Sequence, residues 1–147
     1  MGRHSNVLEE ASYVPEFDLS ELLIFKIKDF IDEKFHQAFV DKSELKEILD
    51  QTQILVNDLY LVQTKVVPCF PPKYDIFNVY REKYLNNVYD RIEPFMKENY
   101  LNENKGNLIL FAKWLDGVDE SLKRVGIDIR TTEIGSVRKC FNYFLKN

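Results

Sequence analysis

The fold of this chain is decided by residues 66–77, which read VVPCFPPKYDIF. Three prolines fall within five residues, and each lacks a backbone donor, fixes φ and disfavours the α conformation of the residue before it. The segment therefore cannot be helix interior. An apolar pattern of helical spacing enters it and a second one leaves it, so we expect a stiff, extended corner that holds Cys69 and Phe70 between prolines.

The composition indicates one globular domain. The chain has 147 residues, of which 45% are hydrophobic and 14% aromatic, which is enough to bury a core and too apolar for disorder. The net charge of −4 comes from 24 acidic and 20 basic residues that are well mixed. Because phosphate backbones attract basic stripes, this charge pattern disfavours nucleic-acid binding.

The first residues do not have the pattern of a signal peptide. Residues 1–6 lack the apolar region of a signal peptide and fit a cloning-tag remnant, and residues 1–17 show no periodicity and are predicted to be a disordered lead-in. No apolar run approaches the roughly 20 residues that span a bilayer, so no transmembrane segment is expected.

The first helix is predicted to begin at Asp18 or Ser20. Ile24 and Phe25 widen its apolar stripe, so we expect this helix to be covered on more than one side. The stripe recurs mostly at spacings of three and four, at Leu19, Leu22, Leu23, Ile27, Phe30, Ile31, Phe35, Ala38 and Phe39.

The second helix is predicted to start at a capping arrangement of Asp41 with Glu44, with Ser43 as a rival cap. Leu49 and Val56 flank a strict heptad, which favours antiparallel bundle or coiled-coil packing. The heptad residues are Leu45, Ile48, Thr52, Leu55, Leu59, Val62 and Val66.

The third helix follows the corner, with Pro71 or Pro72 in its first turn, where a missing donor costs nothing. Its predicted core face consists of Phe77, Tyr80, Tyr84, Val88, Ile92 and Phe95. Pro94 should kink or end this helix. Residues 97–107 are polar and are predicted to be a linker.

Two more helices complete the pattern. The fourth has Trp114 beside a heptad of Leu108, Phe111, Leu115, Val118, Leu122 and Val125, and Gly126 fits a left-handed cap followed by the hydrophobic Ile127. Thr131 or Thr132 is predicted to cap a fifth, with Ile134, Val137, Phe141 and Phe144 on one face.

Together these patterns predict an all-α fold, an antiparallel bundle of about five helices over residues 18–147. Because the last stripe stays apolar to the end, we expect either a fragment of a longer helical protein or a chain whose last helix docks on a neighbour.

The sequence offers little catalytic or metal-binding chemistry. Glu33 and His36 form a Glu-x-x-His step, but a di-iron site needs a second such step and further inward carboxylates. The other histidine, His4, lies in the lead-in, so His36 is expected at the surface and no metal or cofactor is predicted. Asp116, Asp119 and Glu120 are expected to be an acidic surface turn that is merely solvated.

The two cysteines are expected to be reduced and buried, as in an intracellular protein, with a disulfide between Cys69 and Cys140 as the alternative. Lys73 and the start of the third helix offer Cys69 a weak version of a reactive-thiol environment. The simpler interpretation is a small buried hydrophobe in a tight corner.

The corner also resembles a known family. Residues 67–77, followed by Tyr80 and Tyr84, resemble the Cys-Phe-Pro-Pro-x-Tyr signature of the Sec-six family of exocyst subunits, exocyst component three in animals. The apolar run of residues 107–115 into a tryptophan resembles the same family, and the likeness covers about residues 55–128. The sequence departs at Val118 and Leu85, where members often carry Tyr and His.

The resemblance implies a rod of stacked antiparallel helical bundles without enzymatic activity, in the complex that tethers secretory vesicles to the plasma membrane before SNARE-mediated fusion. It implies other exocyst subunits as partners, the Sec-eight subunit foremost, and a plasma-membrane SNARE. It places the protein in the cytoplasm, peripheral at sites of exocytosis. The corner residues would be structural determinants of the turn: Pro68, Cys69, Phe70, Pro71, Pro72, Tyr74 and Phe77.

Two other functions stay open. A membrane-lipid-binding module would use a local basic face, made of Lys34, Lys42 and Lys46 or of Arg138, Lys139 and Lys146. A hydrolase or redox enzyme would rest only on Cys69 and on Glu33 with His36.

Overall fold

The computed structural model describes residues 19–97 and 104–146. The described part is all-α, as predicted, and contains no strand. Its α-helices are α2 (Leu19–Phe39), α3 (Leu45–Leu61), α4 (Ile76–Ile92), α6 (Lys105–Arg124) and α7 (Ile134–Lys146). The predicted lead-in of residues 1–17 lies outside the described residues.

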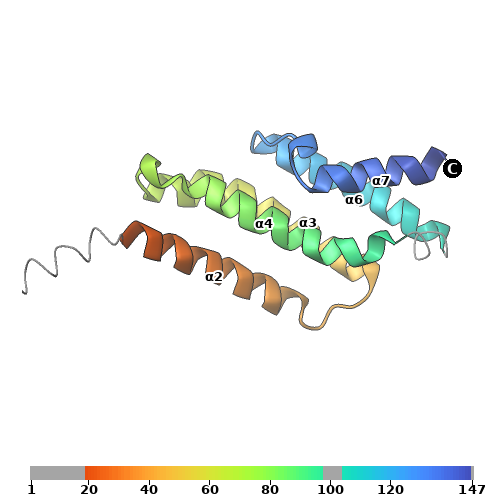
Figure 1. The fold of residues 1–147 in the computed structure, drawn as a ribbon, viewed down its shortest axis with the longest axis horizontal. Coiled ribbons are helices and arrows are strands. Elements are labelled where there is room, and N and C mark those ends of the chain that lie inside the picture. Colours follow the sequence, from red (N-terminus) through yellow and green to blue (C-terminus); the bar gives the residue numbers. More distant parts are fainter. Residues whose placement is uncertain (1–18, 98–103, 147) are drawn as a thin grey trace, which may run out of the picture.

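The helices run back and forth along the long axis of the molecule (Figure 1). α3 is central, because it packs against both α4 and α6. α2 packs mainly on α4 at one edge, and α7 packs on α6 at the other. The antiparallel bundle expected from the heptads is therefore confirmed.

The core follows the two heptads. The heptad of α3 is buried from Leu45 to Val62, and Val66 is only partly buried where the helix gives way to the π-helical turn η1 (Val62–Val66). On α6, Leu108 is partly buried and the rest of the predicted heptad, with Trp114, is buried. A helix with neighbours on two sides buries a regular stripe, and both α3 and α6 meet this condition.

The first helix departs from the prediction. The only buried residues of α2 are Ile31 and Phe35. Leu19, Phe25 and Phe30 are 65%, 66% and 62% exposed. α2 rests mainly on α4, so the helix that was expected to be covered on more than one side is covered on one.

Two of the predicted caps are wrong. Glu44 precedes α3 without making a side-chain cap, and Asp41 pairs with Lys42 at 3.4 Å instead. Before α7, the hydroxyls of Thr131 and Thr132 donate to the carbonyl oxygens of the 3-10 turn, each at 2.7 Å. These bonds lie within η5 (Ile129–Thr131) and at its end, and α7 begins only at Ile134, so neither threonine directly precedes α7.

The ends of α6 have well-defined caps. Asn104 accepts a hydrogen bond from the Gly106 amide at 2.8 Å, so the helix begins inside the predicted 97–107 linker. Residues 98–103 of that linker lie outside the described residues. At the other end Gly126 has φ of 80°, and Ile127 N donates to Leu122 O at 2.9 Å, as predicted for a left-handed cap with a buried residue after it.

The corner is two tight turns around a short extended step. η2 (Val67–Cys69) and η3 (Pro72–Tyr74) are 3-10 turns, and Phe70 and Pro71 between them are extended. The corner is thus extended only in its middle. Pro72 opens η3, and α4 starts at Ile76, later than predicted.

The far end of α4 follows the prediction for Pro94. The α-helix ends at Ile92 and continues as the 3-10 turn η4 (Glu93–Met96), which has Pro94 near its start.

Two corner residues are less buried than predicted. Cys69 is exposed, and its thiol lies 3.4 Å from the Lys65 carbonyl oxygen, to which it donates. Phe77 is partly buried, whereas Ile76 beside it is 2% exposed. The left-handed backbone of Asp75 precedes α4. Ile76 is buried outside the main core cluster, and Phe77 packs against that cluster while staying partly exposed.

Candidate interaction site

The residues considered for metal or thiol chemistry do not form a site. Within the described residues, no group of three His, Cys, Asp or Glu side chains is placed to hold a metal ion. Glu33 accepts a hydrogen bond from Gln37, and His36 is exposed, as expected of a surface residue. Cys69 and Cys140 are both free; Cys140 is partly buried, and burial raises the pKa of its thiol.

Lys34 links three helices, α2, α3 and α4. Its Nζ lies 2.9 Å from Asp58 Oδ2 on α3 and 3.1 Å from the Tyr84 hydroxyl on α4. Burial lowers the pKa of Lys34, but the hydrogen bonds to Asp58 and Tyr84 outweigh it and hold this pKa above its ordinary value. The pKa of Tyr84 is also above its ordinary value, in this case because burial disfavours the charged phenolate. The group is therefore part of the scaffold.

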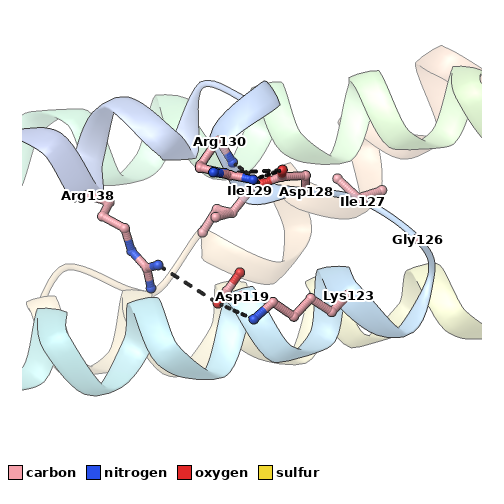
Figure 2. Close-up of a pocket in the computed structure, with 8 residues that line it drawn as sticks. All are labelled: Asp119, Lys123, Gly126, Ile127, Asp128, Ile129, Arg130 and Arg138. Atoms are coloured by element: carbon pink, nitrogen blue, oxygen red, sulfur yellow. Dashed lines mark hydrogen bonds and ion pairs between the residues drawn. The ribbon is translucent and has the colours of Figure 1, made fainter.

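A hollow of about 550 Å³ lies between α6 and α7 and is lined by charged residues (Figure 2). Arg138 reaches to 3.9 Å from Asp119, which also pairs with Lys123 at 3.2 Å. Arg138 also lies 3.7 Å from Asp116, so the prediction of mere solvation is wrong for both Asp116 and Asp119.

The same hollow carries a second ion pair. Hydrogen bonds from the Arg130 side chain and backbone lower the pKa of Asp128 to about 2. The three cations drawn in Figure 2 share two carboxylates, because Lys123 and Arg138 both pair with Asp119. The lining keeps one net positive charge, but each of these cations already has a carboxylate partner, so the hollow gives little support to an anion-binding role.

The basic residues considered for lipid binding are mostly paired as well. Lys42 lies 3.4 Å from Asp41 and Lys46 lies 2.8 Å from Asp50, in addition to the pairs of Lys34 and Arg138 described above. Lys139 is exposed on α7. Ion pairs within the molecule reduce the charge available to attract anionic lipid, so these faces give little support to the lipid-binding alternative.

The corner forms a mostly apolar hollow, which we call the corner hollow. Its volume is about 440 Å³, and its lining consists of Val67, Pro68, Phe70, Pro71, Pro72, Asp75, Ile76 and Phe77. Five of the seven predicted corner residues are thereby brought together. Cys69 is not among them, and Tyr74 packs near Phe70 with a ring distance of 6.5 Å.

The predicted corner residues did not include three residues that line this hollow, Val67, Asp75 and Ile76. Asp75 has φ of 49° and ψ of 48°, and it precedes α4 without making the side-chain capping bond usual for aspartate there. The signal available in the sequence was an aspartate placed directly before an apolar pair at a helix start.

A second hollow, of about 530 Å³, adjoins the first and shares Asp75 and Phe77 with it. It extends to residues 125–128 at the end of α6 and to Thr131. The corner and the turn between α6 and α7 thus face a common concave region, with the Asp75 carboxylate at the shared edge.

None of the described helices combines the length and apolar character that crossing a bilayer requires.

A comparison with solved structures gave no significant match. A family model described as exocyst complex component Sec6 matches residues 20–130, a span that runs from α2 through the corner to η5. The match covers more than half of the chain and includes the signature segment on which the resemblance rested. The chain therefore belongs to this family of exocyst complex components.

Proposed function

We propose that this chain is a non-catalytic part of an exocyst subunit and that it acts through protein contacts. The complex would tether secretory vesicles to the plasma membrane before SNARE-mediated fusion, with the chain cytoplasmic and peripheral at sites of exocytosis. The family match over residues 20–130 is the observation that carries this proposal.

The surface of the molecule supports a contact function. Leu19, Leu22, Phe25 and Phe30 expose 45–66% of their surface on α2, and Ile54 and Leu61 expose 56% and 58% on α3. Large exposed apolar side chains are a common feature of surfaces that contact other proteins. The elongated, back-and-forth arrangement of the helices also suits one segment of a rod of stacked bundles (Figure 1).

The partners that we propose are other exocyst subunits, with the Sec-eight subunit foremost, and a plasma-membrane SNARE. Immunoprecipitation of the parent protein from a eukaryotic lysate should recover exocyst subunits, identified by mass spectrometry. Recovery of none of them would overturn the proposal.

A parallel measurement separates this function from lipid binding. Co-sedimentation of the chain with vesicles that contain anionic lipid should give little binding, because most of the candidate basic side chains are paired within the molecule. Strong binding that vanishes at high salt would favour the lipid-binding module instead.

A further inference from the structure

We infer that the corner hollow is a docking site for a partner protein segment that carries a large apolar side chain next to a lysine or arginine. The inference rests on the proposed function, namely that the chain works through protein contacts, and adds the chemistry of one contact.

The walls of the corner hollow are apolar and rigid. Pro68, Pro71 and Pro72 are exposed, and Val67, Phe70 and Phe77 are partly buried. Prolines have no backbone N–H and a fixed φ, so this wall presents few donors and little freedom to lose when a partner docks. A preformed apolar surface of this kind favours an apolar side chain.

The size of the hollow sets the scale of the occupant. Its volume of about 440 Å³ lies in the range of roughly 300–1,000 Å³ typical of pockets that take up small ligands. A partner would therefore insert one or two side chains here rather than lay a whole helix into the hollow.

Asp75 supplies the charge. It is exposed, it makes no capping bond to α4, and its left-handed backbone is uncommon for a residue other than glycine. It lines both the corner hollow and the adjoining hollow. A carboxylate at this shared edge complements a cationic group that lies next to the inserted apolar side chain.

Among the described residues, Asp75 forms no ion pair. Lys73 Nζ lies 5.5 Å from the centre of the Tyr74 ring. Arg81, which lines the adjoining hollow together with Asp75, donates to the Thr131 hydroxyl at 3.4 Å. Asp75 is therefore available to a cation of the partner. The ion pair between Asp75 and the partner's cation would provide specificity. The contact of the inserted apolar side chain with the corner hollow would supply most of the affinity.

The α6–α7 hollow is a weaker candidate because its charges pair with one another. The exposed apolar residues of α2 line none of the hollows described above, so they do not define an occupant.

The test is a titration of the ¹⁵N-labelled 147-residue chain with matched dipeptides, followed by amide chemical shifts. Acetyl-Phe-Lys-amide should shift the amides of residues 67–78 and half-saturate at a concentration at least about threefold lower than acetyl-Phe-Glu-amide does, because a surface ion pair contributes modestly. Acetyl-Ala-Lys-amide, which lacks the large apolar side chain, should bind at least about tenfold more weakly than acetyl-Phe-Lys-amide.

Two variants and a control sharpen the result. Asp75→Asn keeps a residue that tolerates the left-handed conformation, and it should remove the preference for Phe-Lys over Phe-Glu. Phe70→Ala should weaken the binding of both the Phe-Lys and the Phe-Glu peptide. Asp116→Asn, at an exposed position on α6, should leave the binding of both peptides unchanged. Intact amide spectra would show that each variant is folded.

The inference would be overturned by chemical-shift changes centred on α2 or scattered over the surface. Equal binding of acetyl-Phe-Lys-amide and acetyl-Phe-Glu-amide would also overturn it. So would unchanged spectra at about 10 mM peptide, a concentration that would detect even millimolar affinity. The proposed function fails separately: absence of exocyst subunits in the immunoprecipitate overturns it, whatever the dipeptides do. If the subunits are recovered and the dipeptides do not bind at the corner, only the docking site is overturned.

Discussion

The indole Nε1 of Trp114 donates a hydrogen bond to the hydroxyl of Thr52 at 2.8 Å and so links α6 to α3 inside the core. The Thr52 side chain is fully buried, and its hydroxyl donates in turn to the Leu49 carbonyl oxygen at 2.9 Å. The threonine that interrupts the apolar heptad of α3 thus satisfies the polar group of the one tryptophan in the chain. Buried polar groups without such a partner are costly.

Thr52→Val should destabilise the fold by about 1–3 kcal/mol, because it leaves the buried indole N–H without an acceptor while keeping the side-chain shape. Urea unfolding, followed by circular dichroism, would measure this loss. Thr52→Ser is the matched control: it keeps the hydroxyl and should lose only the free energy of a buried methyl group, about 1 kcal/mol. A Thr52→Val variant as stable as the parent would show that the hydrogen bond is unimportant.

Stability should fall at alkaline pH through Lys34 and Tyr84. Both groups have a pKa raised above the ordinary value in the folded state, so their contribution is fully present below the unfolded pKa values, 10.5 and 10.0, and is lost as the pH rises through the folded ones. Urea titrations at about pH 8 and about pH 11 should show a larger loss for the parent than for a Lys34→Met/Tyr84→Phe variant.

Lys46→Met provides the control for this alkaline effect. Lys46 forms an exposed pair with Asp50 within α3, and such pairs contribute little to stability. The control should therefore lose about as much stability as the parent. An equal loss in the Lys34→Met/Tyr84→Phe variant would contradict the assignment.

At the start of α4, Ile76→Ala should cost more than Phe77→Ala. Ile76 is 2% exposed, and truncation of a buried isoleucine costs about 2–5 kcal/mol. Phe77 is only partly buried against the core, so its truncation should cost about half of the value for a fully buried phenylalanine, or about 2 kcal/mol. Denaturant titrations of the two variants would rank them, and the reverse order would place Phe77 in the core.

Gly126→Ala should destabilise the end of α6 by about 1–2 kcal/mol, because a Cβ is disfavoured at a φ of 80° although no atom lies near enough to clash with it. Gly126→Asn should cost less, since asparagine tolerates the left-handed conformation better. Thermal unfolding of both variants would test this order. Equal losses would point to a cause other than backbone conformation.

The sequence correctly predicted the buried face of the helices that pack between two neighbours. The heptads of α3 and α6 appear as buried stripes because each helix packs on both sides, so periodicity alone indicates the core face. The same reasoning failed for α2. Its apolar spacing is equally helical, but burial depends on how many elements surround a helix, and periodicity does not contain that information.

The corner shows a second limit. The prolines predicted where helix must stop, and the structure agrees. They did not predict that Asp75 would be left-handed or that Ile76 would be more deeply buried than Phe77. Those details depend on how the turn meets the rest of the bundle. The corner hollow was missed for the same reason, because a concave surface arises only when η2, η3 and α4 come together.

The packing of α2 on one side only also has a consequence for local unfolding of the protein. The α2 helix contributes only Ile31 and Phe35 as buried residues, whereas α3 and α6 are joined by a continuous core. Protein segments with few buried contacts unfold locally at a lower free energy than the whole molecule. Amide protons of α2 should therefore exchange with solvent well before those of α3 and α6. The molecule can release its first helix and keep its centre folded.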